Sequence, residues 1–163
     1  MSTNLTGAAF GGNICVSKAG LAAGTTTTST IGADTNYAIA GRMYTKSSAS
    51  NATTPTTDHA TGAAFRALAA NQACIFVYAL DAAGAIKVIQ GPIVSLSDVT
   101  GKLSAVHFPG VPDDVCPIGY LYAQAGATLS GTWLFGTNNL SSVTGMTYTF
   151  RDLAVLPAAP ITA

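Results

Sequence analysis

The stretch from Cys74 to Gly91, CIFVYALDAAGAIKVIQG, constrains the fold more than any other part of this chain. It predicts two short antiparallel strands around the turn 81–84, in which Gly84 supplies the positive φ that such turns favour. If the loop holds these four residues, Leu80 pairs with Ala85. Both faces of the hairpin are then mostly apolar, and one face includes the side chains of Phe76, Tyr78, Lys87 and Ile89.

The apolar character of both faces implies that each face is covered. An antiparallel strand with one face in water alternates apolar and polar side chains, and this hairpin does not. One cover is the chain's own core, and the other is a second sheet or another subunit. We expect an interface on the second face, and we assign to it Phe76, Tyr78, Lys87 and Ile89.

The rest of the chain predicts further strands. Short apolar segments separated by Gly and Pro about every ten residues are typical of an all-β, mainly antiparallel β-sandwich or barrel. Residues 37–44 predict a strand pair or one strand bent at Gly41, and residues 118–123 predict a single strand. In 145–153 the alternation directs three side chains inward, namely Met146, Tyr148 and Phe150. Residues 61–73 predict either a turn or a helix of one to two turns.

The chain of 163 residues has no break in composition, which predicts a single β-rich domain over residues 1–163 with long loops. Residues 1–35 are rich in Gly, Ala, Ser and Thr and include the run GTTTTST at 24–30. We expect them to form an extended or flexible N-terminal arm. A mobile loop and an arm that orders against a neighbouring subunit both stay open for this run.

Charge is scarce and balanced. Seven Lys and Arg residues balance seven acidic residues, all of them Asp, and charged residues make up 9% of the chain against ~25% in a typical soluble domain. A near-zero net charge favours association, so we expect burial in a homo-oligomer or on a partner. The cations are dispersed, which argues against nucleic acid, and no apolar run is long enough for a membrane span.

The residues that could carry chemistry are few. His59 and His107 are the only imidazoles, and Asp113 and Asp114 form the only adjacent acidic pair. No nucleotide, zinc or nucleophile-elbow motif is present, so we expect no catalytic residue, no metal and no cofactor. Three well-separated cysteines and the absence of a secretory signal fit reduced thiols in a chain made in a cytosol.

Aromatic residues support one alternative. Tyr120 and Tyr122 share a strand face, and Trp133 and Phe135 follow shortly after them in the sequence. Such a group predicts either sandwich core or a platform for stacking sugars. The second reading would make the chain a glycan-binding head-fibre or tail adhesin. A secreted β-sandwich enzyme or binding module is a third class, which the missing signal and missing Glu disfavour.

Several segments together resemble a known family. The order of TPTTD, TGAAF, LDAAGAIKVIQG, PDDVCPIGY and GTWLFG, within residues 36–156, is similar to that in small head-associated virion proteins of tailed bacteriophages. These proteins are regarded as capsid decoration, or cement, proteins. None of the segments is a catalytic motif, so the resemblance rests on their order and spacing.

The resemblance implies a non-enzymatic virion protein that binds the outer surface of a phage capsid and stabilises contacts between major capsid protein subunits. It implies synthesis in the bacterial host cytoplasm, a final location on the capsid exterior, and a homo-oligomer, with a trimer expected from local three-fold sites. It does not identify the residues that contact the shell, so none is transferred.

Overall fold

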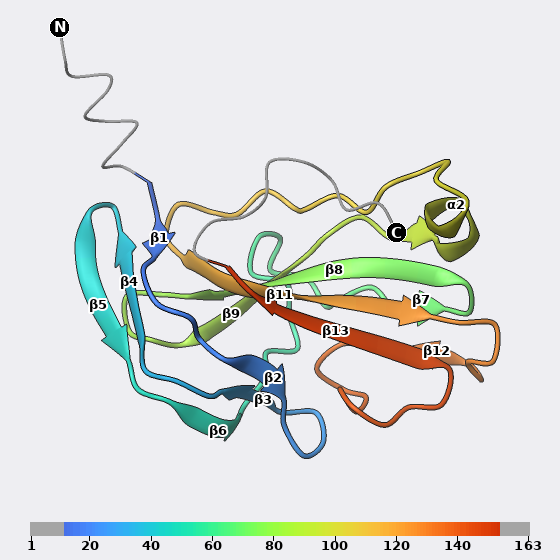
Figure 1. The fold of residues 1–163 in the computed structure, drawn as a ribbon, viewed down its shortest axis with the longest axis horizontal. Coiled ribbons are helices and arrows are strands. Elements are labelled where there is room, and N and C mark those ends of the chain that lie inside the picture. The colour runs from blue at the N-terminus through green and yellow to red at the C-terminus, as the bar shows by residue number, and fades with distance from the viewer. Residues whose placement is uncertain (1–11, 154–163) are drawn as a thin grey trace, which may run out of the picture.

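The computed structural model describes residues 12–153, which fold into antiparallel β-sheets with one short helix (Figure 1). The strands are β1 (Ile14–Cys15), β2 (Leu21–Ala23), β3 (Ser29–Ile31), β4 (Thr35–Ile39), β5 (Arg42–Lys46), β6 (Ala49–Ala52), β7 (Leu68–Ala69), β8 (Gln72–Leu80), β9 (Ile86–Gln90), β10 (Val94–Ser95), β11 (Cys116–Ala125), β12 (Thr132–Trp133) and β13 (Met146–Asp152). The helix is α2 (Leu96–Thr100). The all-β, mainly antiparallel prediction is confirmed.

A five-stranded sheet forms the centre of the fold. Its strand order is β10-β8-β11-β13, and β9 also pairs with β8. Three smaller sheets, β1-β4-β5, β2-β3-β6 and β7-β12, complete the described strands. None of these sheets closes on itself, so the architecture is sandwich-like and the barrel alternative does not apply to residues 12–153. No helix among the described residues is long and apolar enough to cross a membrane.

The central hairpin has a different register from the predicted one. Leu80 pairs with Ile86, and Ala79 pairs with Lys87, so the connecting loop is one residue longer than expected. The Asp81 carboxylate accepts hydrogen bonds from the Ala83 and Ala85 N–H groups, and these bonds hold Ala85 inside the loop. A shift of one residue moves every side chain of β9 to the opposite face.

The first face of the central sheet carries the larger core. Phe76 stacks on Phe135 with ring centroids 4.6 Å apart, and Phe65 and Trp133 pack edge-on around this pair. The three smaller sheets cover this face with buried side chains, among them Cys15, Leu21, Ile31, Tyr37 and Leu68. The β13 residues predicted to point inward, Met146, Tyr148 and Phe150, pack against the same core.

The second face is covered by the chain itself. Ile75, Val77 and Ile89 are buried there beneath Val99 of α2 and residues of the connector 101–115. The connector residues that pack on this face are Val106, Phe108, Val111 and Val115. Both faces are therefore covered as expected, but the second cover comes from the same chain and no other subunit is needed for it.

The helical alternative for residues 61–73 is wrong. This segment forms a turn after Asp58, an isolated bridge between Thr57 and Ala64, and then β7. The Asp58 carboxylate accepts hydrogen bonds from the Ala60 N–H and the Thr61 hydroxyl, and side-chain bonds of this kind compete with helix formation. The only described helix, α2, falls in a segment for which no helix was expected.

The N-terminal arm does not extend over residues 1–35. Strands β1, β2 and β3 lie in this range, and Cys15 and Ile31 are fully buried. The Leu21 N–H also donates to the Asp152 carboxylate, which joins β2 to the end of β13. Residues 12–35 therefore belong to the folded body because their apolar side chains complete its core. The remainder of the predicted arm, residues 1–11, lies outside the described residues.

Candidate functional site

The four residues assigned to an interface do not share a surface. Phe76 and Tyr78 lie in the first core, whereas Ile89 is buried on the second face. Lys87 is half-buried, and its ammonium group lies 3.5 Å from the Asp81 carboxylate. The register shift separates Phe76 and Tyr78 from Lys87 and Ile89, and the connector covers the second face. This part of the sheet therefore presents no apolar surface to a partner.

The predicted aromatic platform is divided in the same way. Tyr120 and Tyr122 lie on the second face, where Tyr120 packs edge-on against Phe108. Trp133 and Phe135 are fully buried on the first face. The sheet separates the two pairs, so they cannot stack on one sugar. Of the two predicted roles, these side chains take the one of sandwich core.

The thiols and imidazoles form no catalytic arrangement in residues 12–153. All three cysteines are buried, and desolvation raises the pKa of Cys74 and of Cys116 to about 12, which keeps these thiols protonated and poor as nucleophiles. His59 lies 3.1 Å from an Asp114 carboxylate oxygen and joins its loop to the connector. The described residues contain no group of three His, Cys, Asp or Glu side chains that could hold a metal ion.

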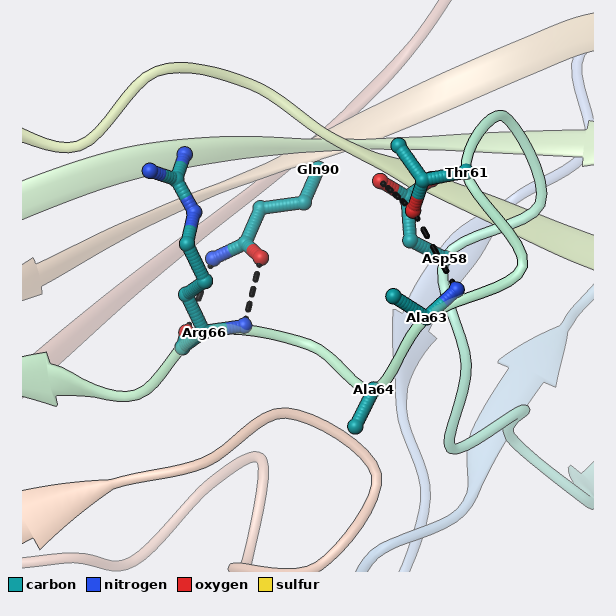
Figure 2. Close-up of a pocket in the computed structure, with 6 residues that line it drawn as sticks. All are labelled: Asp58, Thr61, Ala63, Ala64, Arg66 and Gln90. Atoms are coloured by element: carbon teal, nitrogen blue, oxygen red, sulfur yellow. Dashed lines mark hydrogen bonds between the residues drawn. The ribbon is translucent and has the colours of Figure 1, made fainter.

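One hollow lies between the loop 58–66 and the end of β9 (Figure 2). Its volume is about 300 Å³. The loop is attached to β9 at two points, because the His59 N–H donates to the Val88 carbonyl and the Gln90 side chain bonds to the Arg66 backbone. The side chains that line the hollow come from Asp58, Thr61, Ala63, Ala64, Arg66 and Gln90.

Most polar groups of this hollow stabilise the loop itself. The Gln90 side chain accepts from the Arg66 N–H at 2.7 Å and donates to the Arg66 carbonyl at 2.8 Å. The Asp58 carboxylate is engaged by Ala60 and Thr61. Within residues 12–153 the Arg66 guanidinium makes no ion pair, and Figure 2 shows it extending away from Asp58. The hollow therefore offers one free cation but no catalytic pair.

A second feature is an exposed apolar surface on the β1-β4-β5 sheet. Ile14 pairs with Ala38, which pairs with Met43, so these side chains lie on one face, and Val16 follows Ile14 on the same side. We name the surface of Ile14, Val16 and Met43 the outer face. These side chains are 42%, 56% and 58% exposed. Elsewhere in residues 12–153, Leu103 is the only other large apolar side chain so exposed.

The third feature is the free edge of the same sheet. Among the described strands, β5 pairs with β4 alone, and it lies at the rim of the molecule in Figure 1. Ile39 and Arg42 flank the two-residue turn of this hairpin, in which Ala40 and Gly41 both have positive φ. From this turn onward, hydrogen-bonded and non-hydrogen-bonded residue pairs alternate along the two strands. The N–H and C=O groups of Met43 and Thr45 therefore point away from β4. This edge can accept another strand.

Sequence reasoning identified β4 and β5 as a possible strand pair but did not single out the outer face or the free edge. The exposure of Ile14, Val16 and Met43 depends on the tertiary structure, so no pattern in the sequence marked this surface. Comparisons of this chain with protein-family models, with curated proteins and with solved structures find no match.

Proposed function

We propose that this chain is a non-enzymatic structural protein of a phage virion, which binds the outer surface of the capsid and stabilises contacts between major capsid protein subunits. The proposal is supported by the resemblance of residues 36–156 to head-associated virion proteins and by the scarcity of charge. As the resemblance implies, the shell-bound unit is a homo-oligomer, with a trimer expected.

The observation that carries the proposal is the free edge of β5. Its outward N–H and C=O groups at Met43 and Thr45 can pair with an extended segment of the capsid protein, a mode of recognition called β-augmentation. Main-chain hydrogen bonds of this kind need no charged contacts. This matches a chain whose formal net charge is +0 and whose charged residues are few.

The stabilising effect would come from repetition over the shell. One added strand of five residues buries a small area and confers modest affinity. Neighbouring copies on an icosahedral lattice raise the effective concentration of each binding segment, which increases the overall avidity. Because the surface carries little charge, we expect head binding to change little between low salt and 0.5 M salt. Binding that depends on attraction between charges would weaken as the salt concentration rises.

The test is co-sedimentation of the full-length protein with expanded, undecorated phage heads. We expect saturable binding in a fixed ratio to the capsid protein, and light scattering on the free protein gives its oligomeric state. Absence of binding by folded, soluble protein would contradict the proposal. Binding to a glycan array would then favour the adhesin alternative, although the aromatic residues first considered for it lie on opposite faces.

Two substitutions at one position test the role of the edge. Thr45→Pro removes an outward N–H donor and obstructs strand addition, and Pro is tolerated on edge strands. Thr45→Val is the matched control, because both variants lose the hydrogen bond from the Thr45 hydroxyl to Asn36 but only the Pro variant loses the N–H. We expect Thr45→Pro to weaken head binding by about tenfold, the effect of roughly 1.4 kcal/mol. Equal binding by the two variants would exclude this edge.

A further inference from the structure

We propose that the hollow between the loop 58–66 and the end of β9 binds a small zwitterion, with the ligand's carboxylate at Arg66 and its amino group at Asp58 (Figure 2). The proposal concerns the free protein and does not depend on capsid binding. Two side chains of opposite charge line this one hollow, and among residues 12–153 neither of them forms an ion pair.

Asp58 is a buried acidic side chain without a cationic partner. Only 8% of this residue is exposed, and the ion pairs among residues 12–153 involve Asp81 and Asp114 instead. Every Lys, Arg and His of the chain falls in this range, so no other part of the chain supplies a cationic side chain. Buried charges in proteins are ordinarily paired. An ammonium group in the hollow would supply the missing partner.

The Asp58 carboxylate has acceptor sites to spare. One oxygen accepts the Ala60 N–H at 3.0 Å, and the other accepts the Thr61 hydroxyl at 3.2 Å. An ionised carboxylate offers about four acceptor positions, so about two stay available beside these bonds. The local bonds therefore fix the orientation of Asp58 without using up its capacity to accept a ligand's N–H groups.

Arg66 supplies the opposite charge on the other side of the hollow, where it extends away from Asp58 (Figure 2). Its guanidinium forms no ion pair among residues 12–153, and all seven acidic side chains of the chain lie in this range. A guanidinium group can hold a carboxylate through two parallel hydrogen bonds. Arg66 is therefore available to a carboxylate that does not come from a side chain of this molecule.

The space between the two charges limits the ligand to a small molecule. Its volume is about 300 Å³, which is at the lower end of the range of ~300–1,000 Å³ for small-molecule sites. Ala63 and Ala64 contribute apolar lining between the polar groups. An apolar lining with a few polar groups is typical of such sites. The matching ligand has an amino group and a carboxylate separated by a short aliphatic chain.

The hydrogen bonds of the loop hold the hollow in shape. The Asp58 N–H donates to the Ala63 carbonyl at 2.8 Å, and the Gly62 N–H donates to the Asp58 carbonyl at 2.7 Å. The His59 N–H donates to the Val88 carbonyl and fixes the loop to β9. A site that is already formed loses little conformational entropy when it binds a ligand. Binding should therefore leave the fold unchanged.

The experiment is an NMR titration of the full-length, ¹⁵N-labelled protein with three probes. γ-Aminobutyrate carries both charges, butyrate carries only the carboxylate, and butylamine carries only the amino group. The readout is the shift of the backbone N–H signals of Ala63, Ala64 and Arg66. We expect saturable shifts with γ-aminobutyrate in the millimolar range. Butyrate and butylamine should each bind about fivefold more weakly or less, because each leaves one charged side chain unpaired.

Two substitutions of arginine locate the site. Arg66→Gln removes the guanidinium but keeps the backbone bonds to Gln90, so the loop should stay folded, and it should weaken γ-aminobutyrate binding about tenfold. Arg151→Gln changes an exposed arginine of β13 and is the matched control, with binding equal to that of the wild type. Absence of saturable shifts in the wild type would overturn the proposal. Equal affinity for γ-aminobutyrate and either single-charge probe, or unchanged affinity in Arg66→Gln, would do the same.

Discussion

The central sheet and the β1-β4-β5 sheet are both antiparallel, yet they place apolar side chains in opposite ways. In β8, every residue from Ala73 to Leu80 is buried, so both faces of the strand are covered. In β5, only Tyr44 and Lys46 are half-buried, and Met43 on the other face is exposed. The difference lies in what covers each face, since both strands pair in the antiparallel way.

This contrast explains how a chain with so little charge keeps most of its large apolar side chains away from solvent. The long apolar runs are concentrated in β8 and β11, which the smaller sheets cover on one face and the connector 101–115 on the other. The apolar excess that suggested burial against another subunit is therefore largely internal. Among residues 12–153, the large apolar side chains that remain exposed are those of the outer face and Leu103. Four substitutions test this division.

The largest effect is expected for Phe76→Ala on the first face. Phe76 is fully buried and contacts the rings of Phe65, Trp133 and Phe135. Loss of its ring leaves a cavity that costs about 3–5 kcal/mol. Urea unfolding followed by the fluorescence of the single tryptophan measures this cost. Phe76→Leu, measured in the same way, should lower the unfolding free energy by less. A loss below about 1 kcal/mol would mean that the first face is not closely packed.

The next effect is expected for Ile75→Ala on the second face of the same strand. Ile75 is fully buried beneath α2 and the connector, so removing its side chain should cost about 2–4 kcal/mol. Ile75→Val, measured in the same way, should cost about 1 kcal/mol. If the connector packed loosely on this face, Ile75→Ala would change the unfolding free energy by only about 0.5 kcal/mol or less, as most surface substitutions do. That result would make the second face resemble the outer face.

A smaller effect is expected for Asp81→Asn in the hairpin loop. Burial opposes charge on Asp81, but hydrogen bonds from Ala85 and Ala83 and the nearby Lys87 outweigh it and lower its pKa. A lowered pKa stabilises the fold above the unfolded-state value and loses this contribution as the pH falls through the folded-state value. The variant should be less stable by about 1 kcal/mol at pH 7.

The pH dependence checks this assignment. The difference in unfolding free energy between wild type and Asp81→Asn should shrink as the pH is lowered below about 4, the usual pKa of Asp in an unfolded chain. Urea unfolding at pH 7, 5, 4 and 3 measures it. A difference that stays constant over this range would show that the loop is held by the hydrogen-bond geometry and not by the charge of Asp81.

The smallest effect is expected for Met43→Thr on the outer face. More than half of this side chain is exposed, and Thr suits a strand, so the unfolding free energy should change by less than about 0.5 kcal/mol. The same urea experiment measures it beside Ile75→Ala. A loss of about 2 kcal/mol or more would contradict the comparison, because it would place Met43 among the buried residues.

The sequence predicted the strands better than it predicted which side chains share a surface. Alternation predicted the inward side chains of β13, and the apolar hairpin predicted two covered faces. The assignment of Phe76, Tyr78, Lys87 and Ile89 to one surface failed because the loop from Asp81 to Ala85 changed the register by one residue. Of the two alternatives for 61–73, a turn or a short helix, the helix failed because Asp58 bonds locally to Ala60 and Thr61.

The sequence by itself determined that this chain forms antiparallel β-structure with a strand buried on both sides, since alternation and apolar runs act over neighbouring residues. Only the tertiary structure decided which segments provide the covers. Val99 and Val106 reach Ile75 and Val77 from outside the hairpin, and Cys15 reaches the first core from β1. Contacts between residues so far apart in the sequence depend on the packing of the whole chain. They cannot be predicted from patterns among neighbouring residues.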